Sequence, residues 1–207
     1  MPKVPFKVSA RTAKLIGLEN FSNAEGAIIE LIKNTYDADS EVCVTVVDLL
    51  YKEIEELSED SETVKKLIPD LKNSSIYIID NGVGMTKSLI SNQWMTIGTD
   101  DKLYSHTSEG GRVKTGAKGI GRFALNRLGL STEMHTISKT KKEIGNYWEV
   151  NWSDFDAKGA VVSKVNANLE DEPNLNLKSP LKNTNFSPTS ADALHTRFGY
   201  CNTMIPF

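Results

Sequence analysis

Residues 22–39 constrain the fold more than any other stretch of the chain, because they combine a helix-start signal with a one-sided polar pattern. Ser22 and Glu25 have the spacing of a capping box, in which two side chains satisfy the unpaired N–H groups at the start of a helix. An apolar run with helical spacing follows. The sequence therefore predicts a helix over residues 23–38.

Three polar side chains of this helix are predicted to share one face. At about 100° per residue, Glu30, Asn34 and Asp37 fall within one narrow arc. The opposite side is predicted to be apolar, and its members are Ile28, Leu31, Ile32 and Thr35. Alone, this pattern describes any amphipathic helix with a solvated polar face. Two glycine-rich segments further along the chain favour a more specific use.

The first glycine-rich segment follows an apolar strand. Residues 75–79 predict a strand that runs directly into Asp80, with Gly82 and Gly84 close behind. A carboxylate placed there accepts a hydrogen bond from a donor such as the exocyclic amine of adenine, and glycines let a flat ring approach the backbone. The same residues also describe an ordinary Asp-Asn-Gly hairpin turn, so this segment alone leaves both interpretations open.

The second glycine-rich segment, residues 116–121, precedes a helix predicted over residues 122–128 and ended by Gly129. Backbone N–H groups at such a junction, the helix dipole and the cation of Lys118 together favour a phosphate. The segment does not match a Walker loop or a dinucleotide fingerprint. An ordinary loop-to-helix junction is therefore the alternative interpretation.

Together, the three segments predict a division of labour at a nucleotide site. Asn34 offers an amide oxygen to Mg²⁺, a cation that prefers oxygen ligands. Glu30, one helical turn earlier, is placed to orient and deprotonate an attacking water. Asp80 would select adenine, and residues 116–121 with Lys118 would hold the phosphates.

The remainder of the chain predicts an α/β fold. The β-branched residues 42–47 predict a strand, and residues 132–138 and 146–152 predict a hairpin. The acidic stretch 48–73 is expected to be a surface helix or an insertion with a solvated face. The other expected elements are a short helix within residues 10–18, a helix at 86–95, a mobile loop at 96–118 and a strand at 161–165.

Composition limits the function classes. The chain has 207 residues and a formal net charge of −3, so it lacks the basic excess that would indicate nucleic acid or an anionic membrane as a partner. Cys43 and Cys201 lie far apart and give no metal or redox spacing. Apolar runs are too short for a membrane span, and the first residues lack a signal-peptide core. We therefore expect a soluble cytoplasmic protein.

The ordered motifs resemble those of the GHKL ATPase superfamily, which includes DNA gyrase, the ninety-kilodalton heat-shock chaperone, histidine kinases and MutL. The matching segments are Glu30-x-x-x-Asn34-x-x-Asp37-Ala38, Asp80-x-Gly82-x-Gly84-Met85 and Gly116-x-Lys118-Gly119-Ile120-Gly121. The segment Trp94-Met-Thr-Ile-Gly98-Thr99-x-x-Lys102 also resembles the one before the lid in chaperone-like and MORC-type members. The resemblance covers roughly residues 10–165.

This resemblance implies a Bergerat fold, an α+β two-layer sandwich in which helices cover one face of a mixed, largely antiparallel sheet. It assigns Glu30 as the general base and Asn34 as the Mg²⁺ ligand. The ATP-binding residues that it implies are Asn34, Asp37, Asp80, Gly82, Gly84, Met85, Thr99, Lys102, Lys118, Gly119, Ile120 and Gly121. Asp37 is alternatively expected only to hold the loop, and Lys102 and Lys118 are alternatively plain lid charges.

The resemblance also sets expected boundaries. It predicts an ATP-binding domain over residues 1–166 with a flexible lid at 96–118, followed by an irregular segment, 167–207. Family members usually carry a later Gly-Thr strand that completes the adenine pocket, and the nearest candidate is His195-Thr196. Because no transducer domain follows to supply a lysine to the γ-phosphate, we expect a fragment of a longer protein with weak ATP turnover.

Three functions are compatible with the resemblance. The first is an Mg²⁺-dependent ATPase that binds ATP and ADP as a conformational switch, with an ATP-dependent homodimer and a downstream domain as partners. The second is the catalytic domain of a sensor histidine kinase. A water-activating Glu30 disfavours it, because hydrolysis would waste the phosphoryl group. The third is a scaffold module that binds ATP without hydrolysing it.

Overall fold

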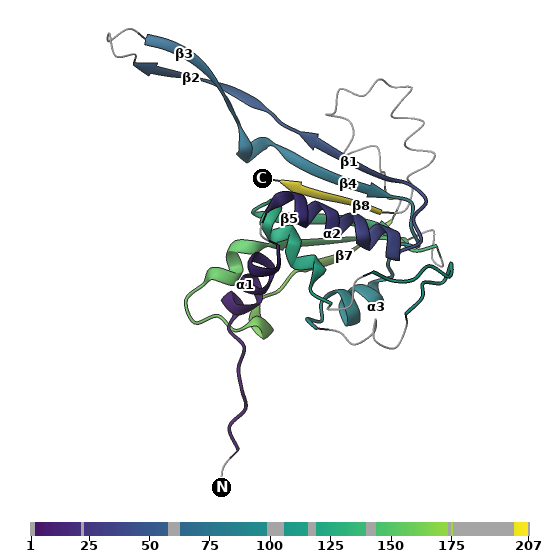
Figure 1. Ribbon diagram of the computed structural model, residues 1–207. Helices are drawn as coiled ribbons and strands as arrows, with labels where there is room; N and C mark the ends of the chain where they lie inside the picture. Colours follow the sequence, from purple (N-terminus) through teal and green to yellow (C-terminus); the bar gives the residue numbers. More distant parts are fainter. Residues whose placement is uncertain are drawn as a thin grey trace.

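The computed structural model describes residues 3–21, 23–57, 63–98, 106–115, 119–139, 144–173, 175 and 201–206. Its strands form a six-stranded sheet and a separate two-stranded ribbon. Figure 1 shows that the helices gather on one face of the larger sheet. The predicted α/β fold, with a helical layer on an antiparallel sheet, is therefore confirmed.

The strands, in chain order, are β1 (Cys43–Asp48), β2 (Tyr51–Leu57), β3 (Thr63–Pro69), β4 (Ser75–Asp80), β5 (Ser131–Ile137), β6 (Ile144–Asn151), β7 (Asn168–Pro173) and β8 (Cys201–Pro206). The α-helices are α1 (Ala10–Asn20), α2 (Ala24–Asp37), α3 (Lys87–Leu89) and α5 (Leu125–Leu128). The π-helical turn is η2 (Ile90–Trp94), and the 3₁₀ turns are η1 (Leu71–Asn73), η3 (Gly121–Ala124), η4 (Trp152–Asp156) and η5 (Val162–Lys164).

The six-stranded sheet has the order β1-β4-β8-β5-β6-β7, and the pairings described within it are all antiparallel. The predicted strand at residues 42–47 and the predicted hairpin are confirmed as β1 and as β5 with β6. Strand β8 lies between β4 and β5, where Cys201 pairs with both Asp80 and Thr136. The last strand of the chain therefore completes the middle of the sheet.

The apolar core lies between the sheet and the helices. Alternate residues of β4, β5 and β6 are buried there against residues of α1, α2 and α5. A smaller cluster joins Tyr77 and Ile79, the alternate residues of β4, to Val42, Val44 and Val46. Strand β4 is thus buried on both faces, which explains why its apolar run is continuous in the sequence.

The prediction of an irregular segment over residues 167–207 is wrong for two stretches. Residues 168–173 form β7, which pairs with β6 at the edge of the sheet, and residues 201–206 form β8. Most side chains of β7 stay exposed, as is common at a sheet edge, so the strand carries no apolar alternation. Both strands belong to the large sheet, and a domain boundary at residue 166 would cut it.

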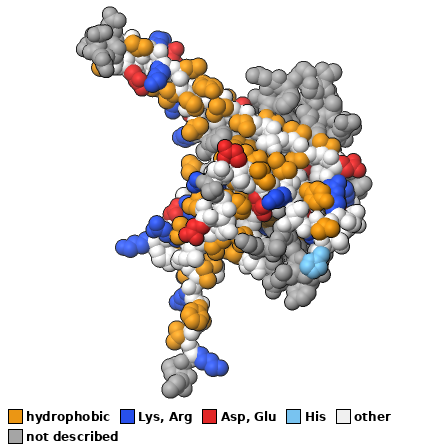
Figure 2. All heavy atoms as spheres, viewed as in Figure 1, with side chains coloured by type: hydrophobic (Ala, Val, Ile, Leu, Met, Phe, Trp, Pro, Cys, Tyr) orange, Lys and Arg blue, Asp and Glu red, His pale blue; other side chains and the backbone are white. Residues whose placement is uncertain are grey.

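Residues 48–73, expected to be a surface helix or an insertion, form an insertion built of strands rather than a helix. Strands β2 and β3 pair as an antiparallel ribbon that extends away from the body of the molecule (Figure 1). Charges pair across it, since Lys65 Nζ lies 2.7 Å from Glu53 Oε1 and Lys66 Nζ lies 3.5 Å from Glu56 Oε2. Apolar side chains also stay exposed on this ribbon (Figure 2).

Two smaller predictions differ from the structure. Helix α1 runs to Asn20, beyond the predicted range of residues 10–18. A Cβ at Gly17 would lie 2.6 Å from the Cβ of Phe123, so this glycine permits close packing and does not end the helix. The strand predicted over residues 161–165 is instead a single bridge to the residue before α1, followed by the 3₁₀ turn η5.

Two findings bear on the expected compartment. Within the described part of the chain, no helix combines the length and the apolar character needed to span a bilayer. Cys43 is a half-buried free thiol, and burial raises its pKa. The cytoplasmic location stays a prediction.

We predict that Gly84→Ala lowers the free energy of unfolding by more than the backbone strain alone would. Gly84 has a φ of +66°, and an added Cβ would lie 1.9 Å from the carbonyl oxygen of Ile137 on β5. The left-handed backbone alone costs an alanine about 1 kcal/mol. The clash should raise the total loss in the free energy of unfolding to about 3 kcal/mol, measured by urea denaturation.

Gly159→Ala is the matched control for this prediction. Gly159 has a φ of +74°, but nothing lies within 4 Å of an added Cβ, so only the backbone cost of about 1 kcal/mol applies. Equal losses in the two variants would show that the close approach to β5 does not matter.

Candidate functional site

A cavity of about 630 Å³ lies between α2, the inner face of the sheet and the π-helical turn η2. This volume is typical of sites for small molecules. The predicted site residues that line it are Glu30, Asn34, Asp37, Asp80, Gly84, Met85, Gly119, Ile120 and Gly121. Gly82 does not line it, and Thr99, Lys102, Lys118 and the pair His195-Thr196 lie outside the described residues.

Helix α2 begins at Ala24, one residue later than predicted. The side chain of Asn23 accepts a hydrogen bond of 2.9 Å from the Gly26 N–H. Asn23 is therefore the N-cap, in place of the predicted Ser22, which lies outside the described residues. Glu25 lies in the first turn, where a negative charge complements the helix dipole.

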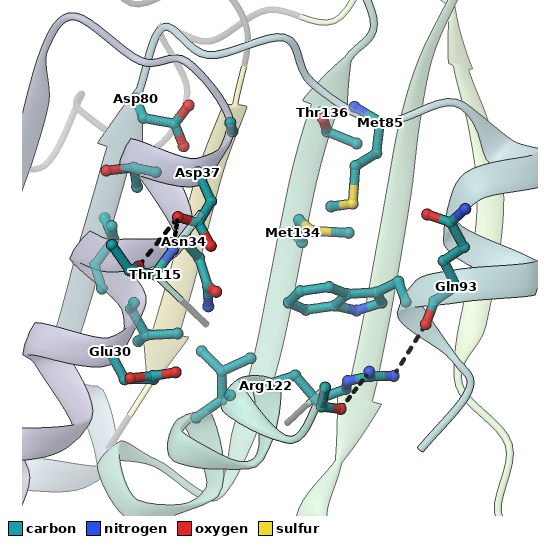
Figure 3. A pocket seen from close by; sticks show the side chains of 18 of the residues that line it. Glu30, Asn34, Asp37, Asp80, Met85, Gln93, Thr115, Arg122, Met134 and Thr136 are labelled. Carbon is teal, nitrogen blue, oxygen red and sulfur yellow. Dashed lines mark hydrogen bonds between the residues drawn. The ribbon is translucent and has the colours of Figure 1, made fainter. Parts of the chain in front are cut away.

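The predicted polar face of α2 is confirmed. Glu30, Asn34 and Asp37 all border the cavity, and Figure 3 shows them along one side of it. The predicted opposite face is partly wrong, because Leu31 and Thr35 are buried and also line the cavity, whereas Ile32 is 40% exposed. The helix is therefore buried along a stripe next to its polar face rather than opposite it.

The second glycine-rich segment packs directly on this polar face. A Cβ at Gly121 would lie 3.1 Å from Glu30 Oε1 and 3.5 Å from Asn34 Nδ2. The other carboxylate oxygen of Glu30, Oε2, lies 3.5 Å from Lys33 Nζ on the same helix. An added Cβ would require the Glu30 carboxylate to shift by a few tenths of an ångström, so glycine at position 121 lets the segment pack on α2 without moving that side chain.

Asp80 lies at another part of the cavity, where β4 ends. Its side chain is buried, and Oδ1 accepts a hydrogen bond of 2.8 Å from the Gly82 N–H. Thr136 of β5, also buried, accepts a hydrogen bond of 3.0 Å from the Met85 N–H through its hydroxyl oxygen. Asn146 donates to the Met85 carbonyl at 3.2 Å. Neighbouring strands therefore fix the backbone of the turn on which Met85 lies.

The glycines of the first turn also allow close packing within the protein, and their predicted place beside a bound ring stays a prediction. A Cβ at Gly82 would lie 2.7 Å from the carbonyl oxygen of Ala38 and 2.9 Å from Asp80 Oδ1. A Cβ at Gly84 would meet the backbone of β5. The space that these glycines leave is filled by the protein, which packs the turn between α2 and the sheet.

Asp37 holds the loop of residues 106–115, as its alternative prediction states. One carboxylate oxygen accepts hydrogen bonds from the Thr115 N–H at 2.8 Å and from the Thr115 hydroxyl at 3.0 Å. Asp37 also borders the cavity. A direct contact between Asp37 and a nucleotide stays a prediction.

Asp39, which the sequence analysis did not single out, holds the same loop. It has a φ of +60°, accepts a hydrogen bond from the Ser108 hydroxyl, and accepts another of 2.8 Å from the Gly110 N–H. The bond from Ser108, followed by that from Gly110, lowers the pKa of the Asp39 carboxyl below its usual range. Arg112 adds to the attachment, since its guanidinium stacks on Tyr36 and donates to a backbone carbonyl of the α2–β1 connection.

Other residues that sequence reasoning missed also line the cavity. Thr136 is one of them, and its strand gives no signal beyond the alternation that places it inward. Trp94 and Arg122 are two more: Trp94 is the first residue of the recognised segment 94–102, and Arg122 directly follows the recognised segment 116–121. Only the tertiary structure shows that η2 and the residue after Gly121 meet at one wall.

The chain matches the family model of histidine kinase-, DNA gyrase B- and HSP90-like ATPases over residues 21–182. It therefore belongs to this family of GHKL-type domains, which bind and hydrolyse ATP. No curated protein sequence matches the chain significantly. The superfamily predicted from the ordered motifs is thus confirmed, while the MORC-like branch stays a prediction.

We predict that Asp39→Asn detaches the loop of residues 106–115 while the helix end keeps its shape. Asparagine tolerates a positive φ, so the change removes chiefly the charge of the acceptor. In the wild type, the attachment should be complete above about pH 4 and should be lost as the pH falls through the lowered pKa of Asp39. The chemical shift of the Gly110 amide, followed by NMR, should report this transition.

In Asp39→Asn, the Gly110 amide should show no such transition. Asp154→Asn, which removes an exposed carboxylate from η4, is the control and should behave as the wild type does. A wild-type midpoint above the ordinary aspartate pKa would contradict the assignment.

Proposed function

We propose that this site binds ATP together with Mg²⁺ and hydrolyses it to ADP and phosphate, and that this cycle switches the conformation of the domain. One observation carries the proposal. Glu30 and Asn34 lie against Gly121 at one part of the cavity, and Asp80 is buried at another part of the same cavity. A nucleotide needs this separation between a base reader and a group of residues that handle phosphates.

Asp80 supports adenine as the base. One of its oxygens is held by the Gly82 N–H, which fixes the plane of the carboxylate. A buried carboxylate accepts hydrogen bonds, so it suits the exocyclic amine of adenine and disfavours the carbonyl oxygen that guanine carries in the same place. The nearby Met85 and Met134 offer apolar surface to a flat ring.

The donors on α2 fit a magnesium ion. Asn34 and Glu30 present hard oxygen atoms on one helix face, one turn apart. Among the described residues, no cluster of three or more His, Cys, Asp or Glu side chains could hold a metal by itself. Mg²⁺ commonly keeps waters and takes phosphate oxygens as its remaining ligands, so a single protein oxygen from Asn34 suffices for such an ion.

Glu30 supports hydrolysis. In the proposed reaction, Glu30 accepts a proton from a water, the water oxygen bonds to the γ-phosphorus, and the bond from that phosphorus to the bridging oxygen breaks to leave ADP. When bound, Mg²⁺ neutralises charge on the phosphate oxygens. The backbone of Gly119 to Gly121 would supply N–H donors to the same oxygens.

The proposed switch depends on helix α2, because α2 carries the proposed general base and also holds a loop. Glu30 lies in its middle, while Asp37 at its end and Asp39 just beyond hold residues 106–115. That loop belongs to the predicted lid at 96–118. We therefore propose that phosphate binding near Glu30 changes the conformation of the lid. The change would pass through the glycine segment 116–121 at the end of the lid.

The proposed partners follow from the same switch. We propose that two partners respond to the conformational change: a second copy of the chain in an ATP-dependent homodimer, and a downstream domain of the parent protein. The extended residues 3–8 support a partner, since Val4 is 85% exposed and Phe6 is fully exposed ahead of α1. Figure 1 shows this arm running away from the body of the molecule.

We predict that Glu30→Gln keeps ATP binding but loses phosphate release. The amide preserves the shape of the side chain yet cannot accept the proton of water, which should lower the rate at least about 100-fold. Binding of ATP, measured by calorimetry, should change less than about twofold, a change below the tenfold that 1.4 kcal/mol would cause. Glu25→Gln, in the exposed first turn of the same helix, is the matched control.

The outcomes of this experiment separate the three functions. Wild-type protein that binds ATP but releases no phosphate would be a scaffold module. Phosphate that appears on a protein side chain instead of in solution would indicate a kinase. Release from Glu30→Gln at the wild-type rate would place the general base elsewhere.

We also predict that the wild type binds ATP more tightly than GTP and that Asp80→Asn reduces this preference. A hydrogen bond to a charged group contributes about 1.5–3 kcal/mol, so the variant should lose roughly tenfold or more in ATP affinity. Calorimetric titration with both nucleotides measures the ratio. Asp48→Asn, at the far end of the neighbouring strand β1, is the control, and equal wild-type affinities for the two nucleotides would overturn the role of Asp80.

A further inference from the structure

Arg122 is a half-buried cation on the wall of the cavity, and no carboxylate pairs with it among the described residues. Its guanidinium donates to the carbonyl oxygen of Gly119 at 2.9 Å and to that of Gln93 at 3.4 Å. The guanidinium carbon lies 5.5 Å from the ring centroid of Trp94. Burial lowers its pKa to about 10.

The wall around Arg122 offers more hydrogen-bond donors than acceptors. A guanidinium carries five N–H groups, and the two described hydrogen bonds use only part of them. The indole N–H of Trp94 is also buried, and it has no partner within the described part of the chain. Buried donors without acceptors are costly, and an anion with several oxygens would satisfy them.

Arg122 lies near the group that the proposed function assigns to phosphates. It directly follows Gly121, whose backbone packs on Glu30 and Asn34. Figure 3 shows Arg122 level with Glu30 across the cavity and well away from Asp80. The side chain of Arg122 reaches toward Gln93 of η2, which lies on the wall opposite α2. A triphosphate beside Glu30 would therefore pass close to the guanidinium.

We propose that Arg122 binds the phosphate oxygens of the nucleotide from the wall opposite α2, and thereby makes the site selective for phosphorylated adenosine. This inference rests on the proposed function and adds a side chain to it. Arginine suits the task because its planar guanidinium can hold two phosphate oxygens at once. The ring of Trp94 would keep the guanidinium in place without neutralising it.

A purely structural role is the competing explanation. Arg122 could serve only to tie η2 to the segment at Gly119, since it bonds a carbonyl on each. The bond to Gln93 is long at 3.4 Å, and neither carbonyl carries a net charge. Such a tie would affect every ligand of the cavity alike, whereas a phosphate contact would affect only phosphorylated ones.

The test compares adenosine, AMP, ADP and ATP, with Mg²⁺ present, by calorimetric titration of the wild type and of Arg122→Gln. We expect Arg122→Gln to weaken ATP and ADP about 10- to 100-fold and to change adenosine less than about twofold. Arg122→Lys keeps the charge without the planar pair of donors, so it should recover part of the loss. Arg11→Gln removes an exposed arginine of α1 and should match the wild type.

Two results would overturn the inference. One is an equal loss for adenosine and ATP in Arg122→Gln with a lowered melting temperature, which would assign Arg122 to the structural tie. The other is unchanged affinity for all four ligands in both Arg122 variants. A wild type that binds none of the four would instead refute the proposed function, and this inference with it.

Discussion

The site depends on one close contact, that between Gly121 and the polar face of α2. Because Gly121 has no Cβ, its backbone packs closely on the side chains of Glu30 and Asn34. The same segment also packs on α1, where Gly17 allows a closer approach, since a Cβ there would lie 2.6 Å from the Cβ of Phe123. Two glycines on different elements therefore allow η3 to pack closely on two helices, next to the part of the cavity that we propose holds the phosphates.

The two parts of the cavity differ in how they are built. Around Asp80, the turn is fixed by strands on both sides, because Gly84 packs on β5 and the Met85 backbone bonds to Thr136 and Asn146. Around Glu30, the walls are helix α2, the π-helical turn η2 and the segment of residues 119–122. In the proposed function, the part fixed by strands binds the base, and the part built from helical turns and a loop segment is the proposed phosphate region.

Helix α2 links this phosphate region to the rest of the molecule. Its buried stripe packs on β4, its polar face borders the cavity, and its last residues hold the loop of residues 106–115 through Asp37 and Asp39. Arg122 adds a second link, since it bonds both Gly119 and Gln93 and so joins the glycine segment to η2. If the proposed site binds phosphates, described contacts connect it to two surface segments.

The sequence by itself determined the motifs, their order and the elements whose patterns depend on local geometry. The face of α2 follows from 3.6 residues per turn, and β4 follows from an apolar run buried on both faces. Only the tertiary structure decided the strands β7 and β8, because their places depend on partners far away in the chain. It also brought Thr136 and Arg122 to the site, since their roles depend on what lies across the cavity and not on their neighbours in sequence.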